Sequence, residues 1–174
     1  MRQGNMEYRA FESILAGLHG VTQDDRGKFR ARLRILRDTG IPVVEQPGKG
    51  SRIDYRFQDL WETHLGLLFV QFGLPPAQVK TVLEDKVGWL NWHDTMRQQE
   101  KLTGSDVWVH IRYFSRNLED GIPAPVTLIK PLDDILIDIK RMDEMPTLRG
   151  AVIGLVNLSK LTRECESAIL KHVR

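Results

Sequence analysis

Short helical stretches, each ended by glycine or proline, fill the first half of the chain. They predict that this half folds as several short helices joined by tight turns. A first helix is predicted from four apolar residues at helical spacing, Phe11, Ile14, Leu15 and Leu18. Gly20, which follows His19, is a natural C-terminal cap for this helix. A second helix carries Phe29, Leu33 and Leu36. Residues that can cap its N-terminus precede it (Thr22, Asp24 and Asp25), and Gly40 and Pro42 stop it.

A hairpin and two further helices are predicted next. The β-prone stretches 41–44 and 52–57 flank Pro47-Gly48-Lys49-Gly50, a turn signal with a basic tip. A helix over residues 58–72 carries Leu60, Trp61, Leu65, Leu68 and Phe69 and ends at Gly73. Pro75-Pro76 suits the start of the following helix, which carries Val79, Val82 and Leu83. This order predicts a winged helix-turn-helix domain over residues 1–85.

The second half mixes strands and helices. Residues 86–106 are predicted as a linker or connecting helix, and residues 107–114 and 126–130 as strands. The pattern at 132–142 fits a helix or a strand, and that at 151–156 fits a strand or the start of a helix ending near Val173. We therefore expect an α+β fold, with a small α+β domain at 107–174 that would dimerise, sense a ligand or bind a protein partner.

Composition excludes several classes of protein. The 174 residues are 41% hydrophobic, which is enough to fill a core. No stretch approaches the roughly 20 apolar residues of a membrane-spanning helix, and the first residues do not resemble a secretion signal. Cys165 is the single cysteine, so the chain has neither an internal disulfide nor a cysteine-cluster metal site. We expect a cytoplasmic, nucleoid-associated protein.

The charge distribution is more informative than the net charge of +2. Between residues 26 and 37 there are six basic residues and no acidic one: Arg26, Lys28, Arg30, Arg32, Arg34 and Arg37. Over residues 26–56, nine basic and three acidic residues give +6, which leaves −4 for the rest of the chain. A basic stripe on a nearly neutral protein indicates a local anionic partner.

A helical wheel of this basic helix predicts how its residues are used. With the apolar residues toward the core, Gly27 and Ala31 lie on the opposite face and Arg34 lies beside them. One flank then carries Arg26, Arg30 and Arg37, and the other carries Lys28 and Arg32. Small outward residues permit close approach to the major groove, and the flanking cations can contact phosphates on both strands.

These positions give the candidate DNA-binding residues. Base contacts are expected from Arg26, Gly27, Arg30 and Arg34, and phosphate contacts from Lys28, Arg32 and Arg37. The DNA backbone or the minor groove is expected to be contacted by the hairpin at 44–55 and the residue after it. The basic residues there are Lys49, Arg52 and Arg56. The alternatives for the basic helix are another nucleic acid or anionic partner, or a plain solvated face.

The stretch GSRIDYRFQDLWETHLGLLFVQFGLPPAQVKTVLED resembles part of the DNA-binding domain of MerR-type regulators. Arg52 and Tyr55 match the family's wing, Asp59-Leu60 opens the next helix, and Phe72-Gly73-Leu74 resembles the turn before the last helix. The resemblance covers residues 11–84 and implies a DNA-binding winged helix-turn-helix. The recognition segment VTQDDRGKFRARLRILRDTGIP is longer here than is usual in the family.

The remaining side chains predict no second site. Five histidines (His19, His64, His93, His110 and His172) lack metal-ligand spacing, and Cys165 is expected as a small buried hydrophobe. The acidic group Asp133, Asp134, Asp138, Asp143 and Glu144 is interpreted as a solvated face or, for the first two, a helix N-terminus, rather than a cation site. Trp61 is expected in the core. Trp89 and Trp92 are expected to pack the two parts together or to line an apolar pocket.

Together these patterns predict a bacterial or phage transcription regulator that binds double-stranded DNA sequence-specifically, with helix 25–38 in the major groove. A homodimer is expected because specific sites are usually read by dimers. A small-molecule or protein effector would bind the C-terminal domain. The alternative is a protein-interaction adaptor that keeps the winged-helix scaffold without binding DNA. No catalytic triad, phosphate loop or dinucleotide fingerprint is present, so neither enzymatic activity, a cofactor nor a metal is expected.

Overall fold

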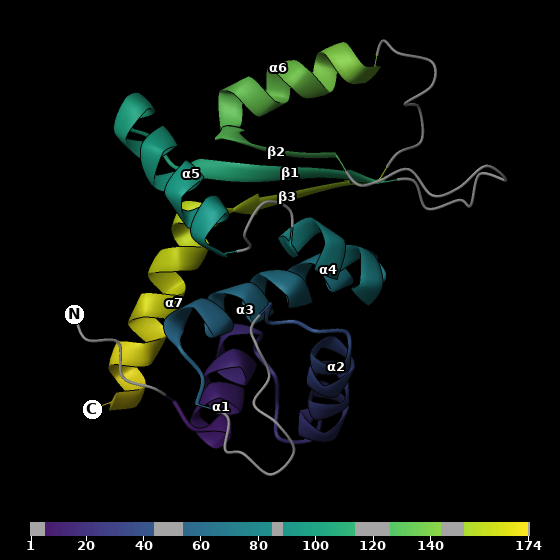
Figure 1. Cartoon of the computed structure of the whole chain (residues 1–174), viewed down its shortest axis with the longest axis vertical. Helices are drawn as coiled ribbons and strands as arrows, with labels where there is room; N and C mark the ends of the chain where they lie inside the picture. Colours follow the sequence, from purple (N-terminus) through teal and green to yellow (C-terminus); the bar gives the residue numbers. More distant parts are fainter. Residues whose placement is uncertain (1–5, 44–53, 85–88, 114–125, 144–151, 174) are drawn as a thin grey trace, which may run out of the picture.

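The computed structural model describes residues 6–43, 54–84, 89–113, 126–143 and 152–173. Its helices are α1 (Tyr8–Leu18), α2 (Arg26–Asp38), α3 (Phe57–Gln71), α4 (Pro76–Glu84), α5 (Trp89–Thr103), α6 (Leu132–Asp143) and α7 (Leu158–Val173). Its strands are β1 (Val107–Tyr113), β2 (Val126–Pro131) and β3 (Val152–Asn157). Figure 1 shows α1 and α2 at one end of the long axis and α6 at the other. The fold is a mixed α+β structure, as the sequence predicts.

The predicted helix ends in the first half are confirmed. Gly20, Gly40 and Gly73 have φ angles of +62°, +88° and +96°, a region that glycine enters without steric cost. At the end of α2, the backbone N–H of Ile41 donates to the Leu36 carbonyl at 2.9 Å, so the chain reverses over one tight turn. The beginning of α2 differs from expectation, because the Asp25 side chain does not cap the helix and instead binds Lys28.

Helix α3 lies at the centre of the helical half. Its residues are buried on nearly every side, including Leu60, Trp61, Leu65 and Phe69. Helices α1, α2, α4, α5 and α7 all pack against it, so even its polar residues Asp59, Glu62, Thr63 and His64 are buried. Helix α3 therefore fixes the positions of the helices on the surface.

The second half is built on a three-stranded antiparallel sheet in the order β2-β1-β3. Val109 of the central strand pairs with Ile129 on one side and with Val156 on the other. The structure decides between helix and strand for both segments that the sequence left open. Residues 132–143 form helix α6, and residues 152–157 form strand β3, which runs directly into α7.

Helix α7 returns from the sheet to the helical half and packs along α1 and α3 (Figure 1). The indole N–H of Trp61 donates to the Thr162 hydroxyl at 3.0 Å, and the Trp61 and Trp92 rings meet with centroids 6.5 Å apart. One apolar core therefore continues from α1 to the sheet. The division into two domains at residue 85 stays a prediction. Side chains from before and after this boundary pack together in the same core.

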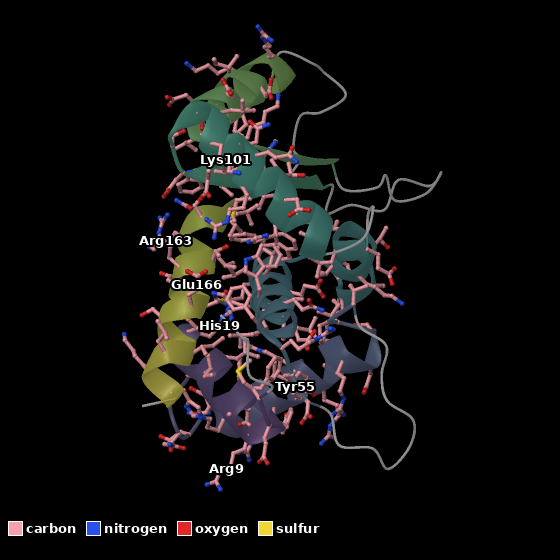
Figure 2. The ribbon with its side chains drawn as sticks, turned by 60° about the vertical axis from the view of Figure 1, so that its left-hand side comes forward. Arg9, His19, Tyr55, Lys101, Arg163 and Glu166 are labelled. Atoms are coloured by element: carbon pink, nitrogen blue, oxygen red, sulfur yellow. The ribbon has the colours of Figure 1, made fainter. Side chains whose placement is uncertain are left out.

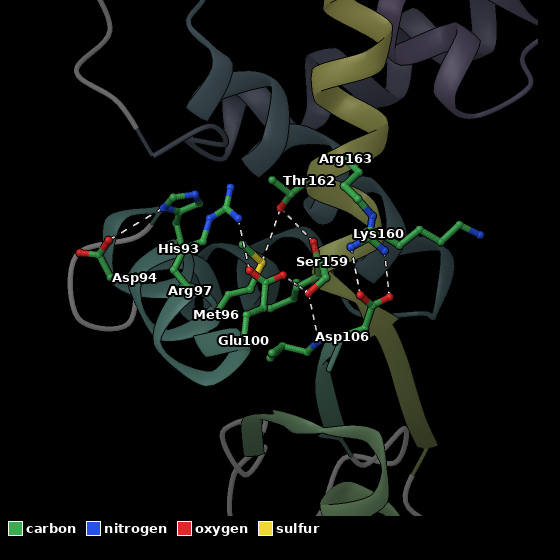
Figure 3. Close-up of polar contacts among 12 residues, drawn as sticks. His93, Asp94, Met96, Arg97, Glu100, Asp106, Ser159, Lys160, Thr162 and Arg163 are labelled. Atoms are coloured by element: carbon green, nitrogen blue, oxygen red, sulfur yellow. Dashed lines mark hydrogen bonds and ion pairs between the residues drawn. The ribbon is translucent and has the colours of Figure 1, made fainter. Parts of the chain in front are cut away.

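A polar network at the junction of α5, β1 and α7 adds to this connection (Figure 3). The Ser159 hydroxyl donates to Glu100 at 2.5 Å and accepts the backbone N–H of Val107 at 3.0 Å. Arg163 donates two hydrogen bonds to Asp106, at 3.0 and 2.9 Å, and these hold the pKa of the Asp106 carboxyl below its usual value. Each polar group thus has a partner on another element.

In the part of the chain that the structure describes, no helix combines the length and apolarity that crossing a bilayer requires.

Candidate nucleic-acid interface

Helix α2 is anchored on one side and open on the other. Phe29, Leu33 and Leu36 are buried against α1 and α3, as the wheel predicts. Gly27 and Ala31 face outward and are exposed, and a Cβ added at Gly27 would meet no atom within 4 Å. The helix therefore presents a face on which its backbone is accessible to a partner.

The side chain that organises the basic flank is Glu12 of α1, which sequence reasoning did not consider. Its carboxylate accepts a hydrogen bond from Arg30 Nε at 2.9 Å, and Arg26 Nη1 lies 3.7 Å away. Glu12 itself is buried, whereas the Arg30 side chain is still 61% exposed. The two arginines share one negative charge, so the group keeps a positive excess at the surface.

A hollow of about 520 Å³ lies over this group, between α1 and the beginning of α2. Besides the three charged residues, it is lined by Arg9, Ser13, Gln23 and Gly27. Figure 2 shows Arg9 at the end of the molecule that α1 and α2 form. Arg9 adds a cation from α1 that the sequence analysis did not assign to the site.

Two further basic side chains of α2 have local partners. Lys28 Nζ lies 3.0 Å from Asp25, and this contact lowers the pKa of the Asp25 carboxyl. Arg37 lies 3.9 Å from Asp38 and near the Tyr55 hydroxyl. Burial nonetheless raises the pKa of Tyr55, whose ring stacks on Phe11 with centroids 4.0 Å apart. Tyr55, which the family resemblance assigned to the wing, is therefore a core residue.

Arg32 and Arg34 have no ion-pair partner within 4.0 Å among the residues that the structure describes, and both are exposed. Ile35, one residue further along α2, is 52% exposed although it is apolar. These three side chains are free to contact a partner without first breaking an internal contact.

The predicted hairpin residues are only partly described. Lys49 and Arg52 lie outside the described residues, as does most of the segment 44–55. Arg56 is the N-cap residue of α3 and lies 3.7 Å from Asp59, which accepts the Arg56 backbone N–H at 2.7 Å. Burial raises the pKa of the Asp59 carboxyl, and the contacts with Arg56 oppose this shift. Arg56 is half-exposed and so stays accessible from outside.

The structure also joins two histidines that are far apart in the sequence. His64 Nδ1 and His19 Nε2 lie 2.8 Å apart, and Gln71 Nε2 lies 3.3 Å from the other nitrogen of His19. Burial lowers the pKa of His64 to about 3. Burial, together with Arg32, lowers the pKa of His19 to about 4. The pair is therefore neutral near pH 7. Among the described residues, no group of three or more His, Cys, Asp or Glu side chains could hold a metal ion.

The remaining residues singled out in the sequence have structural positions. Trp61 and Trp92 are buried in the core, and the side chain of Trp89 lies outside the described part. Cys165 is fully buried, and burial raises the pKa of its thiol to about 12. Asp133 and Asp134 occupy the first turn of α6, one of the two predicted interpretations.

Comparison with models of known protein families finds no match, and comparison with curated proteins finds no significant relative.

Proposed function

We propose that this protein is a sequence-specific, double-stranded DNA-binding transcription regulator of bacterial or phage type that reads the major groove with α2. The observation that carries the proposal is the outer face of α2. There, two small residues, Gly27 and Ala31, lie between arginine-bearing flanks. A helix of this kind can approach base edges closely while the cations contact phosphates on either side.

Roles within the interface follow from the contacts of each side chain. Arg32 and Arg34 are assigned to DNA directly, because neither has to leave an internal partner. Arg26 and Arg30 are held by Glu12, which orders their guanidinium groups before binding and reduces the conformational entropy lost on association. Ile35 is suited to apolar contact with a thymine methyl group.

The C-terminal half is assigned to dimerisation and to sensing an effector. A groove of about 690 Å³ lies between α1 and α7 and falls in the size range of small-molecule sites. Since one wall is α1 of the helical half, a bound effector would contact the same element that holds Arg26 and Arg30 through Glu12.

The first test places a negative charge on the outer face of α2. The Ala31→Glu variant is expected to bind a random-sequence 30-base-pair duplex at least tenfold more weakly, because the new carboxylate would face phosphates. Fluorescence anisotropy at 50 and 200 mM salt measures the affinity. The matched control is Gln98→Glu, which adds the same charge at an exposed position of α5.

A second pair of variants separates local charge from net charge. Arg32→Ala with Arg34→Ala is expected to weaken binding and to reduce the slope of log K against log salt by about 2. Lys101→Ala with Lys171→Ala removes the same charge from α5 and α7 and should leave both quantities near wild type. Equal losses in the two double variants would contradict a specific role of α2. Absence of salt-dependent binding in the wild type would favour the adaptor function.

A further inference from the structure

Helix α6 has one face on the sheet and an opposite face without a partner in the described structure. Ile135 is fully buried, and α6 packs on β1 and β2. On the other side, Leu136 and Ile137 are 43% and 49% exposed. Figure 1 places α6 at the end of the long axis opposite to α1 and α2. The outer face of α6 is therefore accessible and remote from the candidate DNA interface.

The charges on this outer face follow a definite order. At about 100° per residue, Asp133, Asp134, Lys140 and Arg141 all lie within about 60° of Ile137 around the helix. All four are exposed, and within the described part of the chain none has an ion-pair partner within 4.0 Å. The acidic pair precedes Ile137 by about one turn, and the basic pair follows it by about one turn.

The charges along this face of α6 are complementary to those of a second copy of α6 that runs antiparallel to it. In an antiparallel pair of α6 helices with a two-fold axis at Ile137, Asp133 lies opposite Arg141 of the other copy, and Asp134 lies opposite Lys140 of the other copy. A parallel pair would place like charges together. Compensation of the helix dipole explains acids in the first turn and bases in the last. It does not explain a half-exposed isoleucine between them on the same face.

We propose that the outer face of α6 is the homodimer interface of this protein and that its occupant is α6 of a second copy in antiparallel orientation. This two-fold contact is isologous, as in most protein dimers. It leaves α2 of both copies free, and it does not depend on DNA binding. Twelve residues of helix are about 18 Å long and bury less than a standard interface, so we expect a micromolar, salt-sensitive dimer.

The test uses the full chain in sedimentation equilibrium from 1 to 200 μM, at 50 and 500 mM salt. Variant one carries Asp133→Lys and Asp134→Lys, and variant two carries Lys140→Asp and Arg141→Asp. Each alone is expected to be monomeric, with a dissociation constant raised at least tenfold, because like charges would face each other. An equimolar mixture is expected to restore the dimer, because every facing pair then has opposite signs.

Restoration by mixing distinguishes loss of complementarity from loss of folding, since unfolded variants would not recover on mixing. A second measurement uses Ile137→Cys, which should form a disulfide-linked dimer under mild oxidation because the two-fold axis brings the new thiols together. Leu102→Cys on α5 is the matched exposed control, and the buried Cys165 stays in place. A wild type that is monomeric at 200 μM, or a mixture that stays monomeric, would overturn the proposal.

Discussion

Individual charged residues matter here mainly through the partners that the fold gives them. Glu12 is a single carboxylate, yet it holds two of the six basic side chains of the stripe on α2. His19 and His64 form another polar contact between residues that are distant in the sequence but packed together in the helical half. In both cases the chemistry of a residue depends on a neighbour on another helix.

The buried histidine pair predicts that stability falls in mild acid. Near pH 7.5 both rings are almost entirely neutral in the folded and in the unfolded chain, because the ordinary histidine pKa is 6.5. Below it the unfolded chain binds protons, whereas the folded pair does not until about pH 4 for His19 and about pH 3 for His64. The free energy of unfolding should therefore decrease by about 2 kcal/mol for His64 between pH 7.5 and 5.

Urea unfolding at pH 7.5, 6.0 and 5.0 measures this effect. The variant His64→Gln should show a shallower pH dependence than the wild type, and the control His172→Gln, at an exposed position, should keep the wild-type dependence. His93, whose pKa burial also lowers, contributes equally to all three proteins. Identical pH dependence in His64→Gln and the wild type would contradict the prediction.

At the scale of elements, α2 illustrates how local sequence sets a helix. Its three apolar residues fix which side is buried, and Gly40 fixes where it ends. The glycines near its two ends differ in conformation. Gly27 has ordinary helical geometry with open space around it, whereas Gly40 has a positive φ angle.

Alanine at the two glycines should change stability in opposite directions. Gly40→Ala is expected to cost about 1–2 kcal/mol, because a Cβ is strained at a φ of +88° and would lie 3.3 Å from Lys80 Nζ. Gly27→Ala is expected to stabilise the protein by up to about 1 kcal/mol through helix propensity. Thermal unfolding of both variants decides this, and a stabilising Gly40→Ala would show that the turn does not need glycine.

The whole molecule is held together by contacts between the helical half and the sheet. Helix α7 supplies Thr162 to Trp61, and β3 approaches the end of α3 so closely that a Cβ on Gly154 would lie 2.7 Å from the Phe72 ring. Packed side chains therefore connect the two halves directly.

The contact between Gly154 and Phe72 predicts a coupled pair. Gly154→Ala should cost about 1–3 kcal/mol, because the ring has to move out of a packed position. Combined with Phe72→Leu, the cost should be smaller than the sum of the single variants. Gly17→Ala, where a Cβ would meet nothing within 4 Å, is the control and should not destabilise. Strict additivity in the double-mutant cycle would argue against the contact.

The sequence by itself determined the local features of this protein. Helix positions in the first half, the glycine stops, the buried faces of α1 and α2, and the basic stripe were all readable, because each depends on residues a few positions apart. The strands of the predicted hairpin were not, since residues 41–43 form no strand and Tyr55 pairs with Met6 instead. The helical nature of α6 was not readable, since Leu132, Ile135 and Ile139 fit a helix as well as Ile135, Ile137 and Ile139 fit a strand.

Only the tertiary structure decided which distant residues meet. Glu12 and Arg30 are separated by 18 positions, His19 and His64 by 45, and Trp61 and Thr162 by 101. The sequence pattern indicates which side of each helix is buried, but not which other helix that side packs against. The return of α7 onto the helical half, the histidine pair and the arginines held by Glu12 are consequences of that packing, and no local period encodes them.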